Sequence, residues 1–163
     1  MILDALQADK KLRRMALEVA ERNFDQSSLI LIGIRENGVG IADKIATYLK
    51  ESFKGNIEVL WLSLDKQKPA EIVLSRQMDF TGQCILLIDD VANSGRTMLY
   101  ALKPLLEFLP KQIETLVLVE RTHKLFPIDV NYVGISVSTG SSENIKVRVK
   151  DGIITGAELE SGS

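Results

Sequence analysis

The chain has 163 residues, of which 45% are hydrophobic and 26% charged, as expected for one soluble globular domain spanning residues 1–163. The formal net charge of -2 argues against a general polyanion-binding protein. The single cysteine, Cys84, lies in an apolar run and cannot form an internal disulfide, so we predict a buried core residue in a cytoplasmic protein. No apolar run approaches the roughly 20 residues that cross a bilayer, and no secretory signal is visible. We therefore expect no membrane partner.

Hydrophobic periodicity predicts helices that alternate with short buried strands. Apolar residues recur at helical spacing from Leu12 to Ala20, which predicts an amphipathic helix ending near Asn23. We interpret its Lys and Arg residues as a solvated face rather than an RNA-binding stripe. A second helix is predicted from Val39 to Leu49. The predicted strands are Ser28–Ile34, Ile57–Leu64, Glu71–Leu74, Cys84–Ile88, Thr115–Val119 and Tyr132–Val137.

Two further elements complete the expected fold. Met98–Leu109 has a helical pattern that Pro104 should kink or restart. Apolar residues flank Asp151-Gly152, which is a strong signal for a C-terminal β-hairpin. The order of elements predicts an α/β fold with a largely parallel central sheet and helices on its faces. In such sheets ligands bind beyond the carboxyl ends of the strands.

The strongest functional signal follows the predicted strand Cys84–Ile88. Its residues are Asp89, Asp90, Val91, Ala92, Asn93, Ser94, Gly95, Arg96 and Thr97, and a predicted helix comes next. Gly95 permits a tight turn close to a ligand, while Ser94 and Thr97 are small hydroxyl donors. Free N–H groups at the start of a helix favour an anion. The acid pair can accept hydrogen bonds from two vicinal hydroxyls, or hold Mg²⁺ through them. Together these features predict a site for ribose 5-phosphate.

Other phosphate-binding motifs do not fit this segment. The chain contains no G-x-x-x-x-G-K-[ST] of a Walker A loop. It also lacks the G-x-G-x-x-G of a Rossmann fingerprint. The alternative interpretation is an ordinary strand–turn–helix in which Asp89 and Asp90 only cap the helix. Two consecutive acids joined to Ser-Gly-Arg-Thr make that alternative the weaker one.

The stretch CILLIDDVANSGRT resembles the motif that binds phosphoribosyl pyrophosphate (PRPP) in type I phosphoribosyltransferases. The C-terminal half, from LVLVERTHKLFPIDV to SSENIKVRV, is similar to the PyrR group of that family, pyrimidine-operon attenuators that are also uracil phosphoribosyltransferases. The resemblance covers most of the chain. It implies that Asp89 and Asp90 hold the ribose hydroxyls, that Asn93–Thr97 hold the 5′-phosphate, and that Mg²⁺ is the cofactor.

The resemblance also implies roles for three other segments. Arg35, Glu36, Asn37 and Gly38 would form the pyrophosphate loop, in which Glu36 and Asn37 replace the residues usual in the family. Arg121 and His123 would lie at the rim of the active site, near the base. A flexible loop that closes over PRPP, part of a small hood, would lie within residues 61–83, with Asp65 as the match to the family and Lys66 and Lys68 as cations able to reach pyrophosphate.

The resemblance implies a PRPP-dependent phosphoribosyltransferase that acts on a nucleobase such as uracil and releases pyrophosphate. Asp89, Asp90 and Arg35 would be its catalytic residues, and a homodimer is expected. The alternative is a PyrR-like regulator that senses nucleotides and binds RNA with little or no catalysis. The net charge of -2 and the lack of a dense Lys/Arg cluster make RNA the less favoured partner. The base is not readable from any motif.

Overall fold

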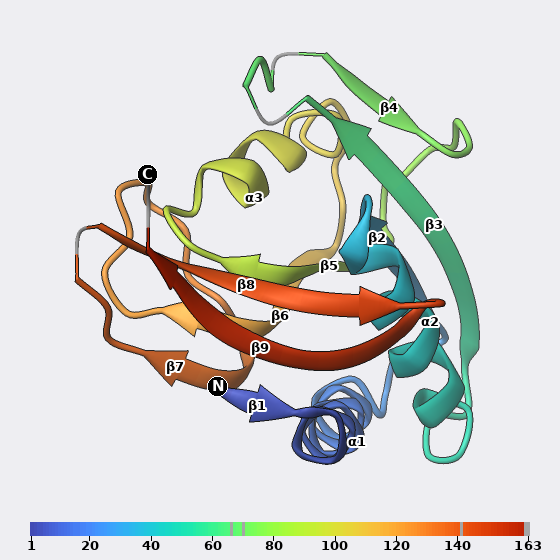
Figure 1. The fold of residues 1–163 in the computed structure, drawn as a ribbon. Helices are drawn as coiled ribbons and strands as arrows, with labels where there is room; N and C mark the ends of the chain where they lie inside the picture. The colour runs from blue at the N-terminus through green and yellow to red at the C-terminus, as the bar shows by residue number, and fades with distance from the viewer. Residues whose placement is uncertain (66, 70, 141, 162–163) are drawn as a thin grey trace.

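The computed structural model describes residues 1–65, 67–69, 71–140 and 142–161. Its centre is a six-stranded sheet in the order β4-β3-β2-β5-β6-β7 (Figure 1). All neighbours pair in parallel except β4, which pairs antiparallel with β3 at one edge. The α/β class and the largely parallel sheet are therefore confirmed. The strands are β2 (Ser28–Ile34), β3 (Asn56–Leu64), β4 (Ile72–Leu74), β5 (Cys84–Ala92), β6 (Gln112–Arg121) and β7 (Tyr132–Val137).

A second sheet crosses in front of the first in Figure 1 and has three antiparallel strands in the order β1-β9-β8. These strands are β1 (Leu3–Asp4), β8 (Glu143–Lys150) and β9 (Ile153–Ser161). The predicted hairpin is confirmed, and its turn uses Asp151 and Gly152 with φ of 53° and 76°. Asp-Gly suits such a turn because both residues tolerate positive φ. The pairing of β1 with β9 was not predicted, since two residues carry no readable pattern.

Helix α1 (Ala5–Arg22) begins with a capping box and ends where the sequence predicted, at Asn23. The Asp4 side chain accepts from the Gln7 N–H at 2.8 Å, and the Gln7 side chain accepts from the Asp4 N–H at 2.9 Å. Helix α2 (Asn37–Leu49) starts two residues before the predicted Val39. In the described ranges, no helix combines the length and apolar character that crossing a bilayer requires.

Helix α3 (Arg96–Ala101) is much shorter than the predicted Met98–Leu109. Turns replace the helix after Ala101. Pro104 has no N–H to donate to the preceding turn and disfavours helical backbone at Lys103, so the helix ends before both. Leu105 is still fully buried, which explains why the apolar spacing suggested a longer helix.

The central sheet separates two hydrophobic cores. Along β2, Leu29 and Leu31 face the core covered by α1, α2 and the three-stranded sheet. Ile30 and Ile32 face the core covered by α3 and the turns after it. Strands buried on both faces in this way have continuous apolar sequences. Cys84 is a buried free cysteine, as predicted, and burial raises the pKa of its thiol.

Strand β5 continues four residues past the predicted end at Ile88. It pairs with β2 only as far as Gly33↔Ile88, but with β6 through Ala92↔Glu120. The acid pair therefore lies in the strand rather than in the loop after it, because β6 continues to pair beyond the end of β2. The chain leaves β2 and β5 toward opposite edges of the sheet, so the space between their carboxyl ends is a topological switch point.

Tyr48→Phe tests how α1 is fixed to α2. The Tyr48 hydroxyl donates a hydrogen bond to Asp9, and this bond is the largest cause holding the pKa of the Asp9 carboxyl below its ordinary value of 3.8. Phenylalanine keeps the ring, over which the Arg13 guanidinium lies at 4.3 Å. We expect a loss of about 1 kcal/mol in unfolding free energy at pH 7. Urea denaturation at several pH values measures it.

The pH dependence of this loss in unfolding free energy tests whether the hydrogen bond to Asp9 is its cause. A carboxyl with a lowered pKa in the folded state stabilises the fold above its unfolded pKa, and this contribution is lost as pH falls through the folded value. The difference between wild type and Tyr48→Phe should thus shrink below pH 3.8. An equal difference at pH 3 and pH 7 would contradict the assignment.

Candidate active site

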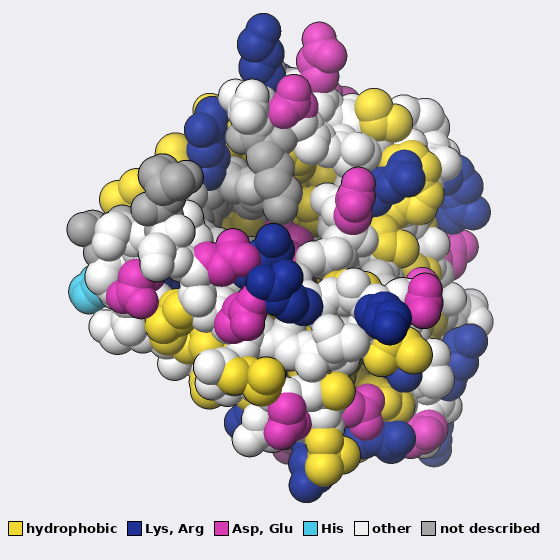
Figure 2. Space-filling view, viewed as in Figure 1, with side chains coloured by type: hydrophobic (Ala, Val, Ile, Leu, Met, Phe, Trp, Pro, Cys, Tyr) yellow, Lys and Arg dark blue, Asp and Glu magenta, His cyan; other side chains and the backbone are white. Residues whose placement is uncertain are grey.

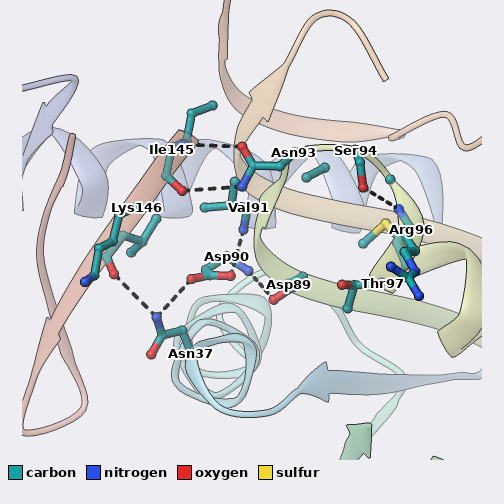
Figure 3. Close-up of a pocket in the computed structure, with 14 residues that line it drawn as sticks. Asn37, Asp89, Asp90, Val91, Asn93, Ser94, Arg96, Thr97, Ile145 and Lys146 are labelled. Atoms are coloured by element: carbon teal, nitrogen blue, oxygen red, sulfur yellow. Dashed lines mark hydrogen bonds between the residues drawn. The ribbon is translucent and has the colours of Figure 1, made fainter. Parts of the chain in front are cut away.

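A cavity of about 330 Å³ lies at the switch point, along the last residues of β5 and the turn after it (Figure 3). It brings together the whole predicted motif with one residue of α2 and one strand of the C-terminal hairpin. The lining residues are Asn37, Asp89, Asp90, Val91, Ala92, Asn93, Ser94, Gly95, Arg96, Thr97, Met98, Ile145, Lys146 and Val147.

The acid pair is buried, with Asp89 3% and Asp90 8% exposed. Buried carboxylates are costly unless donors satisfy them. The Asp90 N–H donates to Asp89 Oδ1 and the Val91 N–H donates to Asp90 Oδ1, both at 2.8 Å. Asn37 Nδ2 donates to Asp90 Oδ2 at 2.9 Å. A carboxylate offers about four acceptor positions, so Asp90 keeps acceptor capacity for a ligand hydroxyl.

Oxygen donors of this kind suit Mg²⁺, which usually takes one or two carboxylates together with substrate oxygens and water. Across the described ranges, no group of three or more His, Cys, Asp or Glu side chains is arranged to hold a metal ion. Asp89 and Asp90 are the residues that would hold a magnesium ion, together with oxygens of a bound ligand.

Gly38 brings the start of α2 against the acid pair. A Cβ atom at this position would lie 2.7 Å from the Ile88 carbonyl oxygen and 3.2 Å from the Asp89 Cα. Side-chain Cβ atoms do not approach backbone atoms this closely, so the packing requires glycine. The close approach puts Asn37 within hydrogen-bond distance of Asp90.

The turn between β5 and α3 is held by the segment that follows β6. Gly95 has φ of +86°, and a Cβ there would lie 2.5 Å from Ile128 Cγ2. The Ser94 carbonyl accepts from the N–H groups of Leu125 and Phe126 at 3.0 and 3.1 Å. The Ser94 hydroxyl accepts from the Arg96 N–H at 3.2 Å. These contacts fix a concave turn whose helix-start N–H groups have no intrahelical acceptor, an arrangement that suits an anion.

Strand β8 supplies a wall of the cavity that the sequence did not predict. Asn93 Nδ2 donates to the Ile145 carbonyl at 3.4 Å, and the Ile145 N–H donates to Asn93 Oδ1 at 3.3 Å. Lys146 and Val147 also line the cavity. The Asp-Gly signal located the hairpin along the chain, but no local pattern says where a hairpin packs.

A second cavity of about 420 Å³ is lined by Arg35, Glu36, Asn37, Ser63, Leu64 and Asp90. It shares Asn37 and Asp90 with the first, so the two adjoin. The Arg35 guanidinium lies 4.6 Å from the Trp61 ring centroid, and the Arg35 N–H donates to the Leu62 carbonyl at 2.8 Å. The Arg35–Glu36 peptide bond is cis. Glu36 is exposed and its side chain does not cap α2.

Four of the remaining predicted residues, Asp65, Lys68, Arg121 and His123, lie outside the linings of both cavities. Arg121 donates to the Gly140 carbonyl at 2.6 Å, and His123 is exposed. Asp65 accepts from the Gln67 N–H at 2.9 Å, and Lys68 is exposed. Lys66 falls outside the described residues. Their roles at the rim and in the closing loop stay predictions.

Sequence comparisons place these features in a family context. The family model described as phosphoribosyl transferase domain matches residues 1–150. A protein of Actinobacillus pleuropneumoniae serotype 5b named bifunctional protein PyrR is 32% identical over 160 residues, covering 92% of this chain and 89% of its own. A protein of the same name from Thermus thermophilus is 35% identical over 161 residues, covering 92% and 88%.

Solved structures show the same fold. A hypoxanthine-guanine phosphoribosyltransferase of Bacillus anthracis superposes with a TM-score of 0.73 at 16% identity, over 97% of this chain and 96% of that one. A hypoxanthine phosphoribosyltransferase of Trypanosoma cruzi in complex with the product IMP gives 0.73 at 14% identity, over 85% and 76%.

Gly38→Ala should destabilise the protein by about 1–3 kcal/mol, because the added methyl group meets backbone rather than a movable side chain. Guanidinium unfolding measures the loss. Gly40→Ala in the same helix is the matched control, since its Cβ would meet only the Gly152 oxygen at 3.3 Å. Alanine favours a helix over glycine, so Gly40→Ala should be close to neutral. Equal effects of the two substitutions would contradict the close approach at Gly38.

Proposed function

Because the chain belongs to the phosphoribosyltransferase family, we propose that it transfers the phosphoribosyl group of PRPP to a nucleobase, with pyrophosphate as the leaving group. One observation carries the proposal: the buried acid pair and the turn Asn93–Thr97 line a single cavity. That cavity combines acceptors for a vicinal diol with donors for a phosphate. Uracil is the first base to test, because the relatives at 32% and 35% identity are named PyrR.

In this proposal each group has one task. The turn Asn93–Thr97 receives the 5′-phosphate through its N–H and hydroxyl groups, while Asp89 and Asp90 accept hydrogen bonds from the ribose hydroxyls. Arg35, which lines the adjoining cavity, binds pyrophosphate through its guanidinium group. Asp65, Lys66 and Lys68 remain the proposed closing loop, and Arg121 and His123 the proposed rim.

The transition state of such a transfer has oxocarbenium character, so positive charge develops on the ribose as the bond to pyrophosphate breaks. The buried carboxylates of Asp89 and Asp90 are oriented before the ligand arrives, and preorganised charge of this kind stabilises a transition state without further reorganisation. Bound Mg²⁺ supplies positive charge that stabilises the departing pyrophosphate.

Pyrophosphate release over a panel of bases tests the activity. Release that requires PRPP, Mg²⁺ and one base supports the proposal. Asp90→Asn should weaken Mg²⁺–PRPP binding at least tenfold in isothermal titration, about 1.4 kcal/mol, because an amide replaces one acceptor oxygen and removes a charge. If the wild type does not bind PRPP at millimolar concentration, the proposal is wrong.

Asp151→Asn is the control for Asp90→Asn. It makes the same substitution and the same change in net charge, but in the hairpin turn, where Asn-Gly is as favourable as Asp-Gly. Wild-type affinity is expected. If both variants lost affinity equally, the effect would come from net charge and not from the acid pair.

A nucleotide-sensing RNA regulator is the second proposed function, because relatives named bifunctional protein PyrR match 92% of the chain. On the face drawn in Figure 2, basic and acidic side chains are interspersed, which favours RNA less than a continuous basic surface would. A gel shift with the organism's own pyrimidine leader RNA, with and without UMP, tests it. Failure to shift in either state counts against this function.

We also propose a homodimer. Tyr100, Leu106 and Phe126 line a hollow next to α3, where Leu106 is 65% exposed. Exposed apolar side chains that gather in this way support an interface. Light scattering after gel filtration should give twice the 18.1 kDa of one chain. A monomer at micromolar concentration would refute it.

A further inference from the structure

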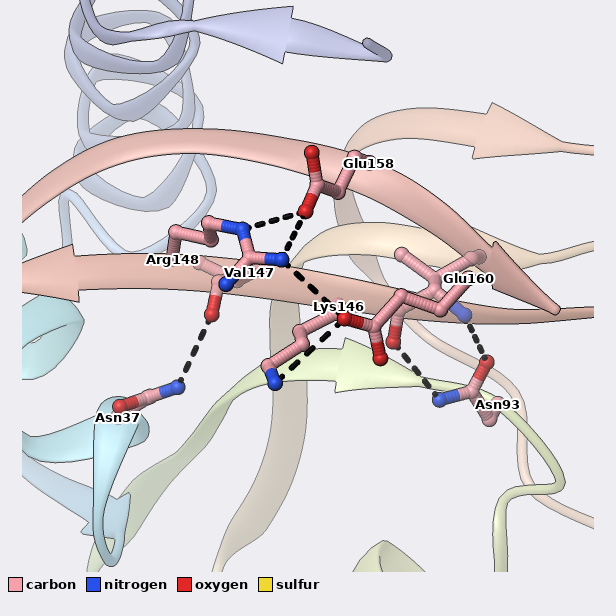
Figure 4. A network of polar contacts seen from close by, with 8 residues as sticks. Asn37, Asn93, Lys146, Val147, Arg148, Glu158 and Glu160 are labelled. Atoms are coloured by element: carbon pink, nitrogen blue, oxygen red, sulfur yellow. Dashed lines mark hydrogen bonds and ion pairs between the residues drawn. The ribbon is translucent and has the colours of Figure 1, made fainter. Parts of the chain in front are cut away.

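Strand β8 is an edge strand of the three-stranded sheet, since within the described part of the chain it pairs with β9 alone. Its other edge meets two asparagine side chains instead of a neighbouring strand (Figure 4). Asn93 exchanges two hydrogen bonds with the N–H and C=O of Ile145. Asn37 Nδ2 donates to the carbonyl of Val147 at 3.4 Å. The amides thus satisfy backbone groups that would otherwise face the cavity.

The spacing of these contacts follows from strand geometry. In an antiparallel strand the N–H and C=O of one residue point to the same edge, and alternate residues share that edge. Ile145 and Val147 are two residues apart, so both present their polar groups to the asparagines. Their side chains are 4% and 3% exposed and belong to the core under α1 and α2. Displacement of β8 would break the asparagine contacts and uncover these side chains together.

Asn37 links the hairpin to the acid pair through a single atom. Its Nδ2 donates to Asp90 Oδ2 at 2.9 Å as well as to the Val147 carbonyl. The other oxygen of Asp90 accepts from the Val91 N–H. The carboxylate is therefore held from two directions, and one of the two donors is also bonded to β8.

Ion pairs between β8 and β9 cannot replace these contacts. Arg148 pairs with Glu158 and Glu160, and Lys146 pairs with Glu160 at 3.5 Å (Figure 4). All four side chains belong to β8 or β9, so these pairs do not connect the hairpin to the central sheet. They are also 32–52% exposed, where ion pairs contribute little.

We propose that Asn37 and Asn93 are positioning residues, which fasten β8 over the cavity and, through Asn37, orient the Asp90 carboxylate for the ligand. The consequence for ligand binding rests on the proposed function. The fastening of β8 by the two asparagines does not rest on the proposed function, because these hydrogen bonds are present without a ligand.

The labelling rate of a buried thiol measures how firmly β8 is held. Val147→Cys puts a reporter under β8, and Cys84 in β5 is an internal reporter of global unfolding. Adding Asn37→Ala or Asn93→Ala should speed labelling of the Val147→Cys thiol by dithionitrobenzoate at least tenfold, while Cys84 stays slow. Asn144→Ala is the matched control, an exposed asparagine on the same strand, and should leave both rates unchanged.

Two outcomes of the labelling experiment would contradict the proposal that Asn37 and Asn93 fasten β8. One is an unchanged rate at position 147 in both asparagine variants. The other is an equal rise at position 147 and at Cys84, which would mean that the variants merely unfold. Neither outcome depends on PRPP, so a wild type that fails to bind PRPP refutes the proposed function and leaves the fastening to be judged by labelling alone.

Asn37→Asp separates orientation of Asp90 from simple packing. Aspartate has nearly the shape of asparagine but brings a second carboxylate against Asp90 Oδ2, and like charges at this distance repel. Mg²⁺–PRPP affinity should fall more than tenfold in Asn37→Asp, because the donor to Asp90 Oδ2 is lost although the shape of the side chain is kept. Wild-type affinity in Asn37→Asp would show that Asn37 acts only as a spacer.

Discussion

The difference in length between two strands that flank β5 is the constraint on which the site depends. β2 pairs with β5 only as far as Ile88, whereas β6 pairs with β5 as far as Ala92. The four residues between these points have regular strand geometry and one edge without a strand partner from β2. That edge holds the acid pair, faces the start of α2 across Gly38, and opens into the cavity. A carboxylate pair in a free loop would have no such fixed direction.

Two adjacent buried carboxylates would destabilise the fold if their oxygens lacked donors. The donors include two local backbone N–H groups and one amide side chain, Asn37. None of the three carries a full positive charge. Asp90 thus accepts from neutral donors, and its remaining acceptor positions are available to a ligand. This suits a site that must hold a diol and respond to positive charge developing on a sugar.

The sequence predicted most of the fold, because buried parallel strands are short, apolar and bounded by polar turns. Ser28–Ile34 and Tyr132–Val137 have the bounds that were predicted. The prediction failed where tertiary pairing overrides local pattern. Asp89 and Asp90 end an apolar run, yet β6 keeps them in the strand, and Leu105 continues a helical spacing although Pro104 stops the helix. The cluster of motif residues in one cavity was predictable, since all of them are consecutive in the sequence at the end of a single strand. The contribution of Ile145, Lys146 and Val147 was not, because they reach the cavity only through packing of the hairpin.

A crystal structure of the protein with Mg²⁺ and PRPP tests the central claim most directly. The account predicts the 5′-phosphate in the turn Asn93–Thr97, and the ribose hydroxyls on Asp89 and Asp90 beneath β8. It also predicts that Asn37 keeps its bond to Asp90. A ligand bound elsewhere, or an acid pair turned away from the ribose, would contradict it.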